Sequence, residues 1–455
     1  MRKHSTPWSW IPTLYVAEGL PYFAVNTLTV LMLTNIGLSK AEMAFYTGWL
    51  YLPWVIKPFW SPFVDLIGTK RAWVSSMQAI LCVAMAAVAG ITIAAVPLML
   101  PASLWLITTL VSFWIMAFAS ATHDIAADGF YILALDERQQ AAYVGVRSTF
   151  YRIASVVGQG GLVMLAGYLE STTGNIPLAW GITFAILSLF FLLIFGYHLL
   201  VLPRPDSDKP ATDVKASGII VDFLHTFVTF FRRPFIWSAL AFMLLYRLPE
   251  ALCIKLVQPF LKDSPAAGGL GLSTTQIGVV NGTVGVIALR AGGIAGGVAI
   301  SRIGLRRCLW PMAAALALPC VVYCYLAAMQ PADFLLVSTL IGIEQFGYGY
   351  GFTAFMLFLM YYSRGESSTS HYAFCTAFMA LGMMLPGMVA GWIFERLAAL
   401  GDMARQYDLL TILLPTDGSD VGYPLFFLFV MLTTLATFGV TALIWRKLPE
   451  LTAKA

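Results

Sequence analysis

Charged side chains are scarce in this sequence. Asp, Glu, Lys and Arg together make up 11% of the 455 residues, whereas hydrophobic residues make up 59%. Soluble domains carry about a quarter charged residues, so this composition excludes an ordinary soluble domain and fits a bilayer as solvent. The net charge is only +4, and the basic residues are scattered between apolar runs. We therefore expect no nucleic-acid partner.

Cysteine and histidine are also few. The six cysteines lie in or at the edges of apolar segments, without a CxxC pair or a histidine at ligand spacing, so we predict apolar core residues. The sequence lacks a Walker phosphate-binding segment, which excludes direct driving by ATP. A membrane-embedded enzyme such as an acyltransferase would need a nucleophile or a His/Asp cluster, and His123 with Asp124 is all that the chain offers. We expect no enzymatic activity, no cofactor and no metal.

Long apolar runs stand in place of the missing charge. A membrane-spanning helix needs about 20 mostly apolar residues. The first run is too long for a signal peptide and lacks a small-residue cleavage site, so we expect a retained first helix. The predicted fold is an all-α integral membrane protein with twelve transmembrane helices, near residues 11–35, 42–63, 72–96, 103–131, 142–168, 178–202, 235–261, 275–299, 307–329, 332–361, 370–397 and 422–446.

The basic residues indicate the orientation in the membrane. Positively charged loops stay in the cytoplasm, and most Lys and Arg residues fall on the cytoplasmic side if the N-terminus is inside. We therefore expect a multi-pass protein with both termini cytoplasmic. A polar linker begins at residue 204, and the amphipathic segment after it ends in Arg232 and Arg233, as a helix on the inner leaflet would. The predicted domains are an N-terminal six-helix half (1–203), a cytoplasmic linker with an amphipathic helix (204–233) and a C-terminal six-helix half (234–455).

The two halves repeat. Gly37-Leu38-Ser39, between the first two predicted helices, is matched by Gly271-Leu272-Ser273 between the seventh and eighth. Two parallel six-helix repeats about an axis normal to the membrane resemble the major facilitator architecture, with a substrate site at the midplane between the halves. Charged loops follow the second and eighth helices in equivalent places, where helices converge at the cytoplasmic side. We expect gate latches there, formed by Asp65, Arg71, Arg302 and Arg306.

Ionisable residues inside the predicted spans need a partner or a cavity, because each costs about 2.5 to 3.5 kcal/mol near the centre of a spanning helix. Most of the acids fall on the first, fourth, seventh and tenth helices, which line the central cavity of this architecture. The residues are Glu18, Asp124, Asp128, Arg152, Arg247, Glu250, Lys255, Arg290 and Glu344. Among them we predict proton-coupling roles for Glu18, Asp124, Asp128, Glu250 and Glu344.

Asp124 and Asp128 are four residues apart and share one helix face, where like charges raise the proton affinity of one carboxylate. A carboxylate that holds or releases a proton near neutral pH suits proton coupling. A purely structural ion pair with Arg147 or Arg152 on the next helix explains the same residues, and the sequence leaves both interpretations open. In either case we predict that Asp124 or Asp128 lies close to Arg147 or Arg152.

A further set of polar and aromatic residues is able to contact a substrate. Arg152 suits an anionic group or neutralises Asp124, and the glycines around Gln159 favour helix packing, which leaves Gln159 as the ligand candidate. Single aromatics in membrane helices are more often packing or interface residues. For the stretch of glycines after Gln345, a hinge or close-packing role and a binding role are equally consistent with the sequence. The candidate binding residues are Arg152, Gln159, Tyr15, Tyr22, Asn26, Tyr151, Arg247, Asn281 and Gln345.

Several stretches together suggest a family. They are Gly19-Leu20-Pro21, KPFWSPFVD (57–65), SATHDIAAD (120–128), Tyr151-Arg152 with Gly160-Gly161, LYRLPEA (245–251), GVVNGTVG (278–285), Glu344 and PGMVAGW (386–392). In these stretches the chain resembles the AmpG-type muropeptide permeases of the major facilitator superfamily, which are related to the acetyl-coenzyme A transporters.

The resemblance implies proton-driven uptake of N-acetylglucosamine linked to anhydro-N-acetylmuramic acid, with or without a peptide, across the bacterial inner membrane for cell-wall recycling. Asp124 and Asp128 match acids that the family places in its fourth helix. The implied partners are a small-molecule substrate and membrane lipid, the energy source is the proton gradient, and we expect a monomer. Tyr131 and Leu133 stand where the family has Lys and Asp, and Glu18 stands where a small residue is expected. Another anionic disaccharide from glycan breakdown therefore stays open as the substrate.

Overall fold

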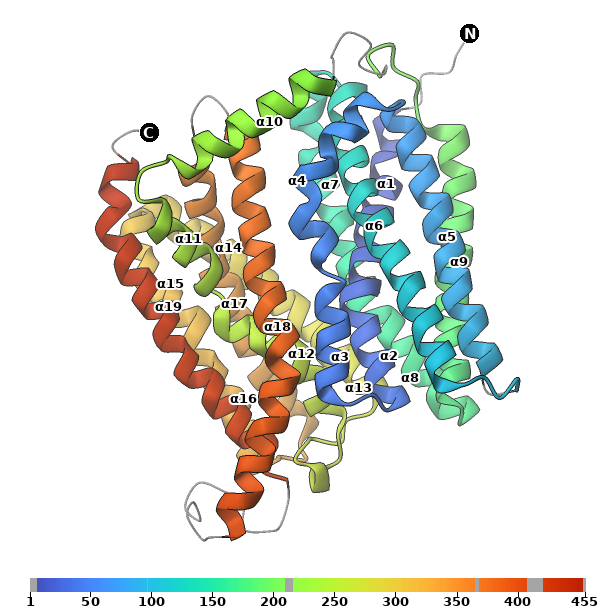
Figure 1. Cartoon of the computed structure of the whole chain (residues 1–455), viewed down its shortest axis with the longest axis vertical. Helices are drawn as coiled ribbons and strands as arrows, with labels where there is room; N and C mark the ends of the chain where they lie inside the picture. Colours follow the sequence, from blue (N-terminus) through green and yellow to red (C-terminus); the bar gives the residue numbers. More distant parts are fainter. Residues whose placement is uncertain (1–5, 96, 209–215, 365–367, 407–419, 453–455) are drawn as a thin grey trace. The chain divides into compact units, whose positions relative to one another are not determined.

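The computed structural model describes the chain except for residues 1–5, 96, 209–215, 365–367, 407–419 and 453–455 (Figure 1). The described residues form helices and no strand. They pack as two compact units: unit 1 consists of Met1–Ile36 and Ile56–Asp222, and unit 2 of Gly37–Val55 and Phe223–Ala455.

Unit 1 is built from long helices that run side by side, as α5 and α6 do in Figure 1. Its helices are α1 (Ile11–Phe23), α2 (Thr29–Ile36), most of α4 (Leu52–Leu66), α5 (Lys70–Ala95), α6 (Ala102–Ala134), α7 (Glu137–Val156), α8 (Leu162–Thr173) and α9 (Ile176–Val201). Short π-helical segments join α1 to α2 (η2, Ala24–Leu28) and α7 to α8 (η3, Val157–Gly161).

Unit 2 repeats this plan. Its helices are α3 (Lys40–Trp49), most of α10 (Ala216–Phe231), α11 (Ile236–Leu245), α12 (Leu248–Lys262), α13 (Thr274–Ile277), α14 (Val286–Ile303), α15 (Leu305–Ala317), α16 (Val321–Met329), α17 (Phe334–Ser363), α18 (Ser368–Gln406) and α19 (Gly422–Thr452). The π-helical segment η5 (Gly278–Gly285) joins α13 to α14, and the 3-10 turn η6 (Leu318–Cys320) joins α15 to α16.

The predicted membrane fold is confirmed. A helix or a run of consecutive helices covers each of the twelve predicted spans, and α10 covers the predicted amphipathic segment. Within the described part of the chain, nine helical segments are long and apolar enough to cross a membrane. The second and seventh predicted spans are each broken, into α3 and α4 and into α11 and α12.

The π-helical segments coincide with proline and with close helix contacts. Pro21 lies inside α1 just before η2, and its missing N–H removes one helical hydrogen bond. A methyl group on Gly158 of η3 would lie 2.7 Å from Cβ of Phe23, so only glycine fits there. The predicted packing role is therefore confirmed for Gly158, and η2 and η3 are held together beside the residues of the candidate site.

The glycines of α17 have a packing role too. A methyl group on Gly349 would overlap the carbonyl of Leu289 in α14, and one on Gly351 would overlap the carbonyl of Met312 in α15. Small residues let helix backbones approach closely in a membrane. Of the interpretations left open for this stretch, close packing is the one that the contacts support.

The segment 37–55 belongs to unit 2 although both of its neighbours in the chain belong to unit 1. Lys40 forms an ion pair with Asp263 at 2.8 Å, and the backbone N–H of Ala41 donates to Glu395 at 3.0 Å. Further along α3, the Lys255 ammonium donates to the carbonyl of Thr47 at 3.2 Å. The predicted halves follow the sequence repeat and the units follow the packing, and the two divisions differ at this segment.

Candidate functional site

The charges of unit 1 meet between α6 and α7. Oδ1 of Asp128 lies 2.6 Å from Nη2 of Arg147 and accepts a hydrogen bond from the Tyr15 hydroxyl at 3.2 Å. The predicted contact between the fourth and fifth spanning helices is thus confirmed, with Asp128 and Arg147 as the pair. Arg152, the other cation considered, is exposed and forms no ion pair with a described residue.

Two tyrosine rings fix the position of Arg147. Its guanidinium carbon lies 4.6 Å from the centre of the Tyr15 ring and 5.6 Å from that of Tyr131. The Tyr131 hydroxyl in turn donates to the carbonyl of Gln140 at 2.5 Å. Such cation–π contacts stabilise a partly desolvated guanidinium, so the Asp128–Arg147 pair has a defined geometry.

Asp124 pairs with a different cation. Its Oδ2 contacts Nζ of Lys57, which α4 contributes. Lys57 is not among the predicted site residues, although a lysine inside the predicted span 42–63 carries the same insertion cost as the predicted ones. The four side chains of the two ion pairs are 24% to 38% exposed, so solvent and solutes can reach them.

Glu18 of α1 belongs to the same cluster but forms no ion pair with a described residue. Its side chain is 6% exposed, and Oε2 has no hydrogen-bond partner among the described residues. The charges of Asp128, Arg147 and Lys57 all act on it. The cluster therefore contains three carboxylates and two cations, which leaves one negative charge when every group is ionised.

A buried hydrogen-bond chain lies beside this cluster. Gln78 Nε2 lies 3.0 Å from Nε2 of His123 and 2.8 Å from Nδ1 of His198, and His198 Nε2 lies 2.9 Å from the Thr13 hydroxyl. His123 is thus bonded to α5 and is not joined to Asp124. Among the described residues, no group of three or more His, Cys, Asp and Glu side chains is placed to hold a metal.

Glu250 and Glu344 of unit 2 each accept two side-chain hydrogen bonds. Two nitrogens of Arg247 donate to the two carboxylate oxygens of Glu250 at 2.8 Å each, and Nη2 also donates to the Tyr348 hydroxyl at 2.7 Å. Glu344 is 8% exposed and accepts hydrogen bonds from the Tyr323 hydroxyl at 3.0 Å and Gln345 at 2.8 Å. The two parallel contacts between Arg247 and Glu250 form a bidentate ion pair, which is the strongest arrangement of such a pair.

The other predicted binding residues are spread over both units. Asn26 in η2 donates to the carbonyl of Tyr22 at 2.9 Å, and its buried Oδ1 has no partner among the described residues. The Tyr151 ring lies 6.0 Å from that of Phe23. Gln159 in η3 is half-buried, as is Asn281 in η5 of unit 2.

Two of the four predicted gating residues, Arg71 and Arg306, contact groups within their own units. Arg71 donates to the carbonyls of Leu202 at 3.2 Å and Leu199 at 2.6 Å, at the end of α9. Arg306 stacks over the Trp445 ring with its guanidinium carbon 4.8 Å from the ring centre. Arg302 is exposed. The side chain of the fourth predicted residue, Asp65, lies outside the described residues.

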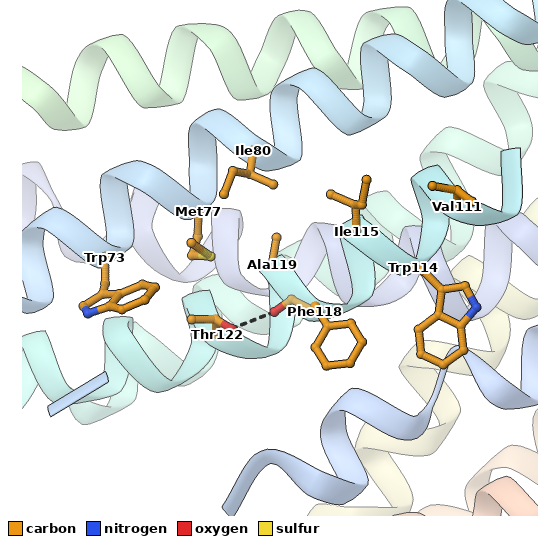
Figure 2. A pocket seen from close by; sticks show the side chains of 9 residues that line it. All are labelled: Trp73, Met77, Ile80, Val111, Trp114, Ile115, Phe118, Ala119 and Thr122. Carbon is orange, nitrogen blue, oxygen red and sulfur yellow. Dashed lines mark hydrogen bonds between the residues drawn. The ribbon is translucent and has the colours of Figure 1, made fainter. Parts of the chain in front are cut away.

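An apolar groove between α5 and α6 is a separate feature (Figure 2). It has a volume of about 470 Å³, and Thr122, whose hydroxyl donates to the carbonyl of Phe118 at 2.8 Å, supplies its one hydroxyl group. The lining is mostly apolar, so its Trp, Ile and Val side chains suit a lipid chain better than a sugar, which needs several hydrogen-bonding groups. The lining residues are Trp73, Met77, Ile80, Val111, Trp114, Ile115, Phe118, Ala119 and Thr122.

An all-helical membrane protein with ionisable side chains held inside its helix bundles is the class of protein that moves solutes or ions. The sequence profile described as Major Facilitator Superfamily matches residues 13–391, and the chain belongs to this family. It is a transporter and not an enzyme.

Relatives of known name indicate a group within this superfamily. The anhydromuropeptide permease of Escherichia coli (strain K12) is 27% identical over 397 residues, which cover 83% of this chain and 72% of the relative. The putative transporter AmpG 4 of Rickettsia conorii is 24% identical over 379 residues, with 81% and 85% covered. The resemblance to the AmpG-type permeases is thereby confirmed.

Solved structures agree on the fold. A bacterial homologue of the human lysosomal transporter Spinster superposes with a TM-score of 0.70, covering 98% of this chain and 97% of that one. The two sequences are 14% identical, so this likeness shows the fold alone.

Proposed function

We propose that this protein is a proton-coupled importer of amino-sugar disaccharides, specifically the GlcNAc-anhydroMurNAc muropeptides released in cell-wall recycling. The E. coli relative named an anhydromuropeptide permease supports this substrate. The proposed location is the bacterial inner membrane, with both termini cytoplasmic, because of the distribution of Lys and Arg. The proposed energy source is the proton gradient, without a cofactor, and the proposed functional unit is a monomer in contact with membrane lipid.

The charge imbalance in unit 1 carries the proposal of proton coupling. Lys57 and Arg147 balance two of the three carboxylates, and Glu18 is left without a paired cation in a buried place. One proton on Glu18 makes the whole cluster neutral. Because an unbalanced charge is costly inside a membrane protein, this protonation is favoured. Asp124 and Asp128 then act as ion-paired neighbours whose charges set how readily Glu18 takes that proton.

The same unit offers groups for the sugar. Arg152 is exposed and forms no ion pair with a described residue, so it suits an anionic or polar group of the substrate. Asn26 has a buried amide oxygen without a donor, which suits a sugar hydroxyl. Tyr15, Tyr22, Tyr151 and Gln159 are the remaining proposed contacts in unit 1.

Unit 2 offers fewer uncommitted groups. Arg247 is already bonded to Glu250 and Tyr348, and Gln345 is bonded to Glu344. Asn281 is a half-buried polar side chain of η5. The proposed substrate contacts in unit 2 are Arg247, Asn281 and Gln345.

A different anionic disaccharide from glycan breakdown is the second candidate. It is favoured by Tyr131, which replaces a family lysine and contacts the Arg147 guanidinium. Replacing a cation by a ring beside the cluster changes the charge that a substrate would meet. The competing sugars therefore belong in the same assay.

Uptake into proteoliposomes tests the proposal. Labelled GlcNAc-anhydroMurNAc should accumulate when an inward proton gradient is imposed, and counterflow without a gradient should exchange it. Uptake that does not depend on the proton gradient would contradict proton coupling. Preferential uptake of another acidic disaccharide would contradict the proposed substrate but not the proposed coupling.

A further inference from the structure

The cation that pairs with Asp124 has no direct part in the function proposed above. Lys57 lies in α4, whereas the candidate residues of unit 1 lie in α1, η2, α6, α7 and η3. Its side chain is 30% exposed and that of Asp124 is 24% exposed, so the pair is accessible to a solute. An accessible cation that holds one acid is available to hold another.

The two cations of the cluster differ in how firmly they are held. Arg147 is bonded to Asp128 and stacked on the rings of Tyr15 and Tyr131. Lys57 is held by its contact with Asp124 and by no ring or hydrogen bond among the described residues. A lysine ammonium is a point charge on a flexible four-carbon stem, whereas a guanidinium is a rigid fork. Lys57 is the cation that can change partner at the smaller cost.

The charged groups that act on Lys57 come from α1, α6 and α7. Glu18 and Asp128 attract its ammonium and Arg147 repels it, in addition to the direct contact with Asp124. Moving Lys57 away from Asp124 would leave that carboxylate uncompensated, because Arg147 stays with Asp128. An uncompensated carboxylate in this place is expected to take up a proton.

We propose that Lys57 links the charge of the substrate to proton uptake. A carboxylate of the substrate pairs with the Lys57 ammonium, and Asp124, released from that ammonium, takes one proton from water. The balance is one anion and one proton bound together, so the charge of the cluster does not change. A neutral sugar leaves Lys57 on Asp124 and recruits no proton at this position.

This inference rests on the proposed function for the identity of the substrate. By linkage, a proton bound together with the anion makes the anionic substrate bind more tightly as the pH falls. The proton on Glu18 does not depend on the charge of the substrate, whereas the proton on Asp124 does. The two protons can therefore be separated by comparing charged and neutral forms of one sugar.

The first experiment measures proton uptake when substrate binds. Protein in lipid nanodiscs is mixed, in weakly buffered solution with a pH indicator, with GlcNAc-anhydroMurNAc or with its neutral carboxamide. With both sugars at saturating concentration, the native protein should take up more protons with the carboxylate form, and Lys57→Gln should abolish that difference. Lys57→Arg, which keeps the charge, should restore it. Lys40→Gln removes a lysine that is ion-paired with Asp263 in unit 2 and should leave the difference unchanged.

The second experiment needs no substrate. Infrared difference spectra should show an additional protonated carboxyl group in Lys57→Gln, and the added Asp124→Asn substitution should remove it. An unchanged carboxyl signal in Lys57→Gln, or an unchanged substrate-linked proton uptake, would overturn the role of Lys57. If the carboxyl signal appears but neither sugar binds the native protein, the link between Lys57 and Asp124 is supported and the proposed substrate is wrong.

Discussion

The two units place their acids in the same helices of the repeat but surround them differently. Glu18 in α1 of unit 1 has no paired cation among the described residues. Glu250, in the matching helix of unit 2, has Arg247 three residues before it and bonds it with both oxygens. In α6 of unit 1 the cations that pair with Asp124 and Asp128 come from other helices, α4 and α7. A repeat can therefore keep its helices and change which of its acids is free to exchange a proton.

The hydrogen bonds of Glu344 sharpen the difference. Glu344 in unit 2 accepts from a tyrosine hydroxyl and an amide, which satisfies a buried carboxyl group without any cation. Glu18 has no such donor at Oε2. We infer that unit 1 exchanges protons and that the acids of unit 2 mainly hold its helices together.

The largest expected effect is on the stability of unit 2. Glu250→Gln leaves the Arg247 guanidinium buried without a countercharge, and breaking such a pair costs about 3 to 5 kcal/mol. The midpoint of thermal unfolding in detergent should fall clearly. The double variant Arg247→Met with Glu250→Gln should recover part of the loss, because it removes the stranded charge.

Transport by the double variant shows whether Arg247 and Glu250 are needed for proton coupling or substrate binding. Stable protein that still accumulates substrate would show that neither residue is needed for coupling or binding. Glu250→Gln protein with unchanged stability and no coupling would contradict the comparison and would move a coupling acid into unit 2.

The next effect is on accumulation by unit 1. Glu18→Gln, Asp124→Asn and Asp128→Asn should each abolish accumulation driven by a pH gradient, because an amide cannot exchange a proton. A gradient of one pH unit supplies about 1.4 kcal/mol per proton, or about tenfold accumulation, and this factor should fall to one. Counterflow should survive in at least one variant, and uptake and counterflow in proteoliposomes are the measurements.

Glu344→Gln is the matched control for Glu18→Gln. Both replace a buried glutamate by its amide, but the hydrogen bonds to Glu344 can be kept by an amide oxygen. Accumulation should therefore persist in Glu344→Gln. If accumulation is lost there and kept in all three unit 1 variants, the two units have exchanged roles.

The membrane explains why so much of the fold follows from the sequence. Each spanning helix needs its own apolar run, so the twelve predicted spans match the helices to within a few residues at most boundaries. The breaks at residues 50–51 and 246–247 were not predicted, because apolar runs on both sides of a break look continuous.

The site was harder to predict because partners depend on helix rotation and contacts distant in sequence. Arg147 and Arg152 are five residues apart, which turns them about 140° from each other around the helix axis, and the sequence does not say which face meets α6. The pairing of Lys57 with Asp124 joins helices whose contact no local pattern reveals. The i, i+4 spacing of Asp124 and Asp128 did predict a shared face, since that depends on one helix alone.

The smallest expected effect concerns the predicted gate latches, which the two units also build differently. Arg71 in unit 1 donates to two carbonyls at the end of α9, whereas Arg306 in unit 2 stacks on Trp445. Arg71→Gln should cost about 1 kcal/mol of stability, because two carbonyls lose a charged donor that solvent partly replaces, and Arg306→Gln should cost less. Thermal unfolding of both variants gives the order of the two effects.

If these residues also act as gate latches, each variant and Asp65→Asn should change the rate of counterflow at saturating substrate. Lys447→Gln, a change of the same kind near the end of α19, should not change that rate. Unchanged rates in all three would leave Arg71 and Arg306 with a purely structural role within their own units.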